Sequence, residues 1–437
     1  MKKSICLLSL AACICGLAGC KGGGSDDFLT IEYVEAGFGQ RPYEAIRDAF
    51  EAEHPDIKIK LKPNASMDST CEIRLKQKKA SDIMIYNRTF ENVRMWAYQG
   101  YIMDLSDVFN EDIGDGTTIL SRMDDNAKKL GRFQNKYYGY PLYYNIDGFV
   151  YDDNLFKANG WNVPETTKEL RELAETIKAS NVKEKGTNTT IAPFVYAAEN
   201  HYLYLADKGW DISYSGTEIM DNFFKFDNVD VFKPTNRVGL EKGLELVQQL
   251  LMNSNYTYKN SGSINYTDAQ VKLFRQGAAM MPNGTWFETE MSDEIEIEKS
   301  VNMKMFAFPQ ISDNAGNVIR PAGYKCEEGK KGVVEGDFNE NLFIPSSCKH
   351  PEWAKTFMKW FATEEGCKAW TKNSSSIRPF NLSEGNNYLD SVYNEVSDFC
   401  KSVIDISKDY QLYYCNSDNL MSVCQQAKYR PAGYYFE

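Results

Sequence analysis

Side chains that could bind a small polar molecule gather in the segment 137–161. An aromatic run, Tyr137–Tyr144, is followed by the amide of Asn145 and the carboxylate of Asp147. Pro141 interrupts the run and has no backbone N–H, which disfavours a central place in one continuous ladder. We therefore expect the segment to leave one sheet and enter another, and to place its polar groups at a crossing between two bodies. Small-ligand sites form preferentially at such junctions.

Residues that enzymes use for proton or group transfer are scarce in this sequence. The chain has three histidines, and His54 and His350 each precede a proline. No histidine has a cysteine, serine or carboxylate at a recognisable spacing, and neither Gly-x-Ser-x-Gly nor His-Glu-x-x-His occurs. The Gly-x-Gly at residues 37–39 lacks the third glycine of a dinucleotide-binding loop. We expect no catalytic residues, no cofactor and no metal site, although a spatially formed carboxylate pair acting on glycans stays open.

The first folded segment must position further candidate residues. Three strand-like stretches alternate with two helical ones, over residues 29–35, 42–53, 57–61, 71–79 and 81–86. This order implies a parallel sheet with helices on both faces, whose ligands lie beyond the carboxyl ends of the strands. The loop after the first strand carries Phe38 and Gln40, and the third strand ends at Tyr86 and Asn87. These four residues are candidate ligand contacts.

The middle of the chain predicts further helices. Thr166 and Glu169 form a capping box before an apolar helical face. Residues 201–209 read as a helix that ends at Gly209-Trp210, followed by a loose region up to Asn236. This interpretation leaves Trp210 in an exposed loop, where its ring could stack on a ligand.

The last third predicts a second set of strands. Residues 278–281 read as a short buried strand, and Trp286 opens the next helix after a Pro-Asn-Gly-Thr turn. Residues 311–340 are rich in glycine and charge, which predicts a long excursion from the fold. A return strand is expected at 341–344.

Size and composition favour a two-domain globular protein. The chain has 437 residues, too many for one compact core, with 43% hydrophobic and 25% charged residues. Its net charge of −12 argues against nucleic acid as a partner, because nucleic-acid binding depends on basic surfaces. Aromatic residues make up 13%, and the 27 tyrosines suit surfaces that stack on flat apolar faces while hydrogen-bonding through their hydroxyls.

The N-terminus has the pattern of a lipoprotein signal peptide. A basic start and an apolar stretch lead to Leu17-Ala18-Gly19-Cys20, which matches the bacterial lipobox. We expect residues 1–19 to be removed, Cys20 to carry the lipid, and residues 20–27 to form a flexible tether. The protein would then be held at the extracytoplasmic face of the cell membrane.

Seven cysteines follow the lipid site, so at least one thiol stays free. No Cys-x-x-Cys pair occurs, which argues against zinc. We expect mostly buried apolar cysteines, with one or two disulfides at most.

Several motifs resemble those of the extracellular solute-binding proteins of ABC sugar importers, the maltose-binding-protein-like family. They are Tyr138-Gly139-Tyr140-Pro141, Tyr151-Asp152, Asn154-Leu155-Phe156, Phe274–Met281 with Asn283-Gly284-Thr285-Trp286, and Ala354–Gly366. The resemblance implies an α/β fold of two lobes, with hinge-crossing strands and a ligand cleft between the lobes. It places residues 28–144 and 309–348 in lobe 1, and residues 145–308 and 349–437 in lobe 2.

The resemblance also implies a function. It predicts a monomer that captures a carbohydrate, specifically an oligosaccharide, and delivers it to the permease subunits of an ABC importer. Trp286 matches the family's cleft tryptophan, Tyr86 aligns with another cleft aromatic, and Asn145 falls at the lobe crossing beside Tyr144. Asn87 stands where the family pattern often carries aspartate.

Two alternatives stay open at this stage. Paired tyrosines such as Tyr143-Tyr144 occur in solute-binding proteins for ferric iron, and phenolate oxygen suits a hard cation. A secreted enzyme that acts on glycans would share the same signal peptide and aromatic composition.

Overall fold

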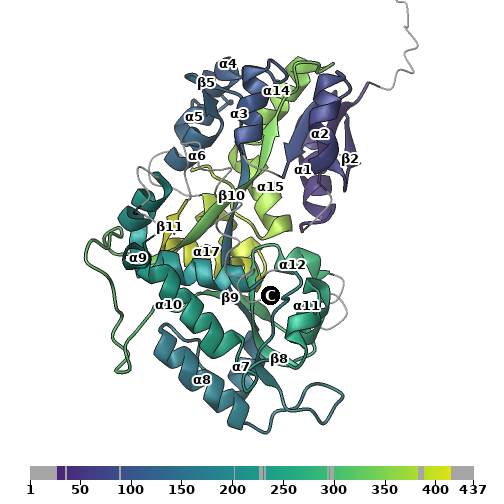
Figure 1. Cartoon of the computed structure of the whole chain (residues 1–437). Coiled ribbons are helices and arrows are strands. Elements are labelled where there is room, and N and C mark those ends of the chain that lie inside the picture. Colours follow the sequence, from purple (N-terminus) through teal and green to yellow (C-terminus); the bar gives the residue numbers. More distant parts are fainter. Residues whose placement is uncertain are drawn as a thin grey trace, which may run out of the picture.

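Two lobes make up the molecule, stacked one above the other in Figure 1. The computed structural model describes residues 27–34, 37–87, 90–200, 202–225, 230, 233–292, 295, 300–381 and 388–414. The signal peptide, Cys20 and nearly all of the tether lie outside the described residues.

The N-terminal lobe is built on the parallel sheet that the sequence predicts. Strands β1 (Leu29–Tyr33), β2 (Ile59–Pro63) and β3 (Ile83–Tyr86) pair in parallel in the order β2-β1-β3. Helices α1 (Arg41–Glu53) and α2 (Met67–Lys76) connect them. The expected β-α-β-α-β unit is confirmed.

Further elements of this lobe come from two distant parts of the chain, residues 90–137 and 351–374. They are α3 (Phe90–Tyr98), α4 (Ser106–Asn110), α5 (Ile119–Arg122), α6 (Asp125–Leu130), β4 (Arg132–Phe133), β5 (Lys136–Tyr137), α14 (Pro351–Trp360) and α15 (Glu364–Ser374). Helices α14 and α15 pack against α1, where Phe357 lies 5.1 Å from Phe50 and Trp370 lies 5.4 Å from Tyr43, measured between ring centroids. Residues 351–374 therefore belong to the N-terminal lobe rather than the second lobe, because their aromatic face completes the core over α1.

Two long strands connect the lobes. Strand β6 (Gly139–Asp152) pairs through its first half with β10 (Val333–Phe343), and through its second half with β8 (Ala278–Gly284) and β9 (Met303–Ala307). The end of β10 also pairs with β3 in the N-terminal lobe, while its start pairs with β11 (Gln411–Tyr413). Strand β6 thus passes from one lobe to the other as predicted, but within one continuous sheet rather than by leaving one sheet for another, and Pro141 lies opposite Asn341 in its ladder.

The C-terminal lobe surrounds β7 (Ala192–Phe194), β8, β9 and the second half of β6. Its helices are α7 (Asp153–Asn159), α8 (Thr167–Ala179), α9 (Leu203–Lys225), α10 (Val238–Leu246), α11 (Tyr266–Phe274), α12 (Phe287–Glu290) and α17 (Asp398–Asp409). Shorter pieces are η2 (Pro234–Asn236), η3 (Val247–Leu251) and η4 (Ser261–Ser263). The segments α16 (Tyr388–Val392) and η5 (Tyr393–Glu395) lie between α15 and α17 in the sequence, and α16 packs against α15. The capping box that opens α8 is confirmed, since Thr166 accepts from the Glu169 N–H and Glu169 from the Thr166 N–H.

Helix α9 continues far beyond the predicted end at Gly209. It runs to Lys225, with a break in helical geometry only at Gly216, whose φ is 71°. Trp210 is fully buried in this helix and donates from Nε1 to the carbonyl of Pro309 at 3.2 Å. The prediction of an exposed loop around Trp210 is wrong, because the helix continues through Gly209 and residues 205–216 are all buried.

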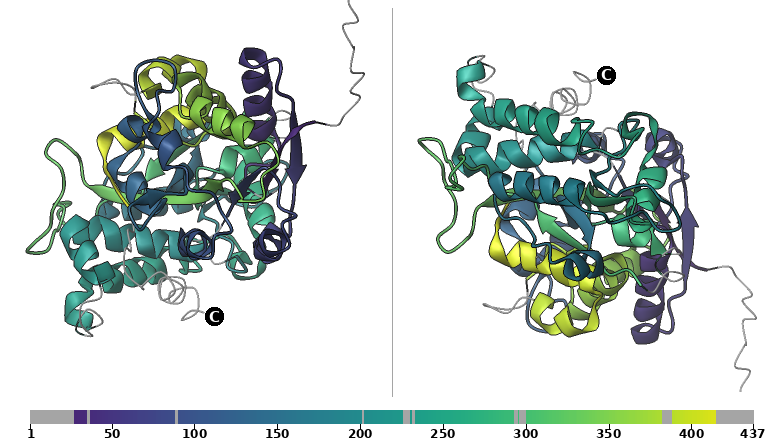
Figure 2. Two further views of the ribbon diagram at one scale, coloured as in Figure 1. Left: turned by 90° about the horizontal axis from the view of Figure 1, so that it is seen from above. Right: turned by 90° about the horizontal axis from the view of Figure 1, so that it is seen from below.

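The excursion is shorter than predicted. Strand β10 begins at Val333, so residues 333–340 belong to the sheet. The segment between β9 and β10 projects from the side of the molecule in both views of Figure 2.

No helix in the described part of the chain is long and apolar enough to cross a membrane. Five of the cysteines are described, and all five are free thiols: Cys71, Cys326, Cys348, Cys367 and Cys400.

Candidate functional site

The crossing of β6 and β10 carries a row of polar groups on one face. Asn145 lies opposite Asp337 in the antiparallel register, so their side chains point to the same side. Asp147 follows two residues later on that face, and its Oδ1 accepts from Asn145 Nδ2 at 2.7 Å. We call this face of Asn145, Asp147 and Asp337 the crossing floor.

An ionic cluster adjoins the crossing floor on the same face of the sheet, because Glu335 lies two residues from Asp337 on β10. Lys208 of α9 forms a salt bridge with Glu335 of β10, and both side chains are almost fully buried. Burial raises the pKa of Glu335 to about 7 and also raises the pKa of Asp147. Burial by itself would lower the pKa of Lys208, but Glu335 and the neighbouring acids hold it well above its ordinary value. The cluster thus keeps one buried cation among Asp147, Glu335 and Asp337.

The C-terminal lobe contributes Trp286 next to the crossing floor. Asn145 Oδ1 accepts hydrogen bonds from both the backbone N–H and the hydroxyl of Thr285, which fixes the turn before Trp286. The Trp286 indole is only partly buried, and its Nε1 donates to Tyr202 Oη at 3.2 Å. A Cβ at Gly284 would lie 2.3 Å from Cζ3 of this ring, so the ring packs directly over the glycine.

The N-terminal lobe reaches the same place through the loop after β1. A Cβ at Gly37 would lie 3.6 Å from the Cβ of Trp286, and Thr289 Oγ1 donates to the Gly37 carbonyl at 3.3 Å. Gly37 has a φ of 60°, a conformation that glycine adopts without strain. Loops from both lobes therefore meet beside the crossing floor, and a ligand there could touch both lobes.

Four predicted site residues belong to this arrangement or border it. Asn145 is hydrogen-bonded to Thr285, and Trp286 follows Thr285 directly. Gln40 is exposed at the start of α1, whereas Phe38 is buried and its ring lies 4.7 Å from that of Tyr143. Phe38 thus packs in the core beside the crossing floor, and Gln40 lies at the surface.

The third strand gives a mixed result. Asn87 follows β3 and is partly exposed, as a loop contact requires. Tyr86 is buried, with its ring 4.9 Å from Trp96 and its hydroxyl accepting from Asn92 Nδ2 at 3.0 Å. In this structure Tyr86 packs in a core rather than lining an open surface.

The two adjacent tyrosines point to opposite faces of β6, because side chains alternate along a strand. Tyr143 packs against Phe38, while Tyr144 lies 5.9 Å from Phe338 and 5.8 Å from Tyr414 on the other side. The sequence analysis placed Tyr144 beside Asn145 in the site. In the structure, Tyr144 instead points away from the crossing floor. A paired-tyrosine iron site would require the two phenol groups to converge, and here they do not. Within the described ranges, no group of three or more His, Cys, Asp or Glu side chains could hold a metal ion.

Sequence reasoning missed Asp337, Glu335, Lys208 and Tyr202. The first two fell within the stretch interpreted as an excursion, although polar residues 335, 337 and 339 alternate there as on a strand. Lys208 lies in the second turn of α9 and Tyr202 directly precedes this helix, and no motif marks either residue. The useful signal would have been the period-2 pattern of residues 333–343.

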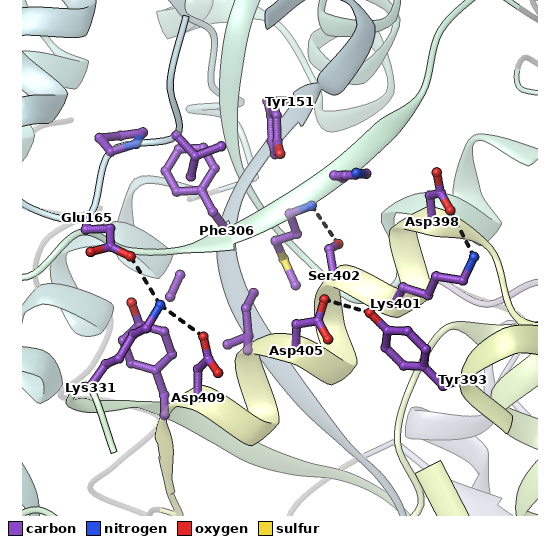
Figure 3. A pocket seen from close by; sticks show the side chains of 17 residues that line it. Tyr151, Glu165, Phe306, Lys331, Tyr393, Asp398, Lys401, Ser402, Asp405 and Asp409 are labelled. Atoms are coloured by element: carbon purple, nitrogen blue, oxygen red, sulfur yellow. Dashed lines mark hydrogen bonds and ion pairs between the residues drawn. The ribbon is translucent and has the colours of Figure 1, made fainter. Parts of the chain in front are cut away.

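A separate groove of about 320 Å³ lies between β9 and α17 (Figure 3). Its charged groups are already paired: Lys331 with Glu165 at 3.1 Å and Asp409 at 3.0 Å, and Lys401 with Asp398 at 3.1 Å. Ser402 Oγ also accepts from the backbone N–H of Met305 at 2.9 Å, on the edge strand β9. The Lys331–Asp409 and Met305–Ser402 contacts fasten α17 to the lobe, whereas the Lys401–Asp398 pair lies within α17. None of the predicted site residues lines this groove.

Comparison with known proteins gives a consistent result. A family model described as bacterial extracellular solute-binding protein matches residues 35–367. The multiple sugar-binding protein of Streptococcus mutans serotype c is 26% identical over 346 residues, which cover 77% of this chain and 72% of that protein. An uncharacterised ABC transporter extracellular-binding protein of Pyrococcus horikoshii is 20% identical over 355 residues, covering 79% of this chain and 69% of that protein.

Solved structures share the fold. The apo form of RafE from Streptococcus pneumoniae matches with a TM-score of 0.62 and 20% identity, over 94% of this chain and 97% of RafE. The bacterial solute receptor AcbH matches with a TM-score of 0.63 and 16% identity, over 93% of this chain and 95% of AcbH. The matched family and these neighbours are solute receptors rather than enzymes. The chain therefore belongs to the family of bacterial extracellular solute-binding proteins.

Proposed function

We propose that this protein is the carbohydrate-capturing receptor of an ABC importer and that its ligand is an oligosaccharide. The observation that carries the proposal is the meeting of a partly exposed indole, Trp286, with the amide and carboxylates of the crossing floor, between loops of both lobes. The Streptococcus mutans relative named as a multiple sugar-binding protein and the RafE structure determined with raffinose support the same ligand class.

The residue types suit a sugar ring. A pyranose has an apolar C–H face, which an indole can cover, and a rim of hydroxyls, which amides and carboxylates can hydrogen-bond. Trp286 would cover the face, and Asn145 lies close enough to its turn to serve the rim. Each hydrogen bond adds only a small net free energy of binding, so affinity depends on how many hydroxyls are hydrogen-bonded.

Capture would be coupled to closure of the two lobes. A ligand that contacts loops of both lobes binds more tightly to the closed arrangement, so its binding shifts the population toward closure. The permease subunits of the importer would then distinguish loaded from empty receptor, and a monomer is sufficient for this cycle.

The family is extracellular, so the protein acts outside the cytoplasm. We further propose that a lipid on Cys20 holds it at the membrane, as the lipobox at residues 17–20 indicates. Cells fed labelled palmitate should label the wild-type protein but not Cys20→Ala. A labelled Cys20→Ala protein would contradict the lipid anchor.

The ligand class is tested by calorimetric titration of mature protein with a panel of glycans at pH 7. We expect saturable binding of at least one oligosaccharide, and recovery of the sugar unchanged. Trp286→Ala should weaken binding severely, whereas Trp353→Ala, which removes a partly buried tryptophan from α14, should leave affinity unchanged. Cleavage of the sugar would refute a receptor role, and equal affinity of Trp286→Ala and wild type would refute the site.

A further inference from the structure

The carboxylate of Asp337 has unused hydrogen-bonding capacity on the crossing floor. Asp337 is only half-buried, while Asp147 and Glu335 beside it are buried. The backbone N–H of Phe338 donates to it, and among the described residues no side chain does. An ionised carboxylate has about four acceptor sites. Asp337 therefore has vacant acceptor sites on the face where Asn145 and Trp286 meet.

The groups around Asp337 come from three elements. Glu335 lies on the same strand β10, and β6 contributes Asp147 and Tyr143, whose charges or potential charges act on it. Helix α9 contributes Lys208 and Tyr204. Lys208 is the cation of this set, and its salt bridge goes to Glu335. Lys208 thus favours an ionised Asp337 without occupying its oxygens.

We propose that Asp337 is a specificity-determining residue, whose carboxylate accepts hydrogen bonds from hydroxyl groups of the bound sugar and makes capture weaken in acid. This inference rests on the proposed function. It adds the requirement that the ligand presents hydroxyl donors, rather than acceptors alone, to the β6–β10 crossing.

The direction of the pH effect follows from which form of Asp337 binds the sugar. Burial raises the pKa of Asp337 to about 6, against the opposing effect of Lys208. Hydroxyl donors stabilise the ionised form, so bound sugar lowers this pKa. Affinity is therefore nearly full at pH 7 and falls as the pH drops through 6, with a Kd about tenfold higher at pH 5 than at pH 7.

The test is calorimetry at pH 5, 6 and 7 with an oligosaccharide that the wild type binds, comparing wild type, Asp337→Asn and Asp125→Asn. Asp125 is exposed on α6, so its replacement changes the net charge equally without touching the site. We expect Asp337→Asn to weaken binding at pH 7 by about tenfold to a hundredfold, and to lose most of the pH dependence. Asp125→Asn should behave as wild type.

A second measurement needs no variant. Titrations of wild type at pH 5.5 in buffers of different ionisation enthalpy should show proton release on binding, and absence of release would overturn the inference. Unchanged affinity or an unchanged pH profile of Asp337→Asn would overturn it as well, while the proposed function stands. A wild type that binds no glycan at pH 7 would refute the proposed function, and this inference with it.

Discussion

Removal of the buried ammonium of Lys208 should destabilise the protein strongly and in a pH-dependent way. Lys208 is 7% exposed and forms a salt bridge with Glu335, which is 3% exposed. Lys208→Met keeps the length of the side chain but leaves the acids of the cluster without their cation. Breaking a buried pair in this way costs about 3–5 kcal/mol, a large share of the stability of most domains.

The sign of the pH effect follows from Glu335. Its pKa in the folded protein is raised to about 7 from 4.5. A raised acid pKa contributes stability that is present below the unfolded pKa and is lost as the pH rises through the folded one. Without Lys208 the pKa rises further, so the deficit of Lys208→Met should be largest near pH 8 and should shrink toward pH 5, where Glu335 takes up a proton.

The assay is urea denaturation followed by circular dichroism at pH 8 and pH 5. The double variant Lys208→Met/Glu335→Gln should recover much of the lost stability at pH 8, because it removes one of the stranded charges. A control, Lys408→Met, breaks an exposed pair with Asp390 and should change little. A deficit for Lys208→Met that is equal at both pH values, or a double variant worse than the single one, would refute this account of the cluster.

Two further substitutions separate packing from binding. Trp210→Ala empties a fully buried core position in α9 and should lower the free energy of unfolding by about 3–5 kcal/mol. The sugar affinity of the folded fraction should not change. Weakened binding without destabilisation would show that Trp210 contacts the ligand. Gly284→Ala should raise the Kd for sugar about tenfold and lower stability by about 1–3 kcal/mol, because its Cβ would displace the Trp286 ring. Calorimetry measures the first effect and urea denaturation the second. A variant with wild-type affinity would show that the position of the ring does not matter for binding.

Much of the fold could be predicted because local patterns and long-range packing agree there. The first parallel strands follow from short apolar or alternating runs, and the helix start at Thr166 follows from side-chain capping; both are local properties. The helix predicted from the sequence ends too early, because Gly209 resembles a helix end. In the fold, Gly209 instead lets α9 approach Phe308, whose ring would lie 2.3 Å from a Cβ at that position.

The site was predicted only in part, because its residues are combined by strand register. Asn145 could be found from a local motif, but its partner Asp337 lies 192 residues away and meets it only through the β6–β10 pairing. The same register explains the error at Tyr144, since neighbours on a strand face opposite sides. A one-residue difference along the strand thus decides whether a side chain lies on the crossing floor.

The claim that a sugar is held between the lobes is tested most directly by hydrogen–deuterium exchange of the mature protein, with and without saturating oligosaccharide. Bound ligand should slow exchange in three separate segments at once: residues 37–43 of the N-terminal lobe, residues 143–147 of the crossing, and residues 284–290 of the C-terminal lobe. Protection confined to one lobe, or found instead along β9 and α17, would contradict a site at the crossing.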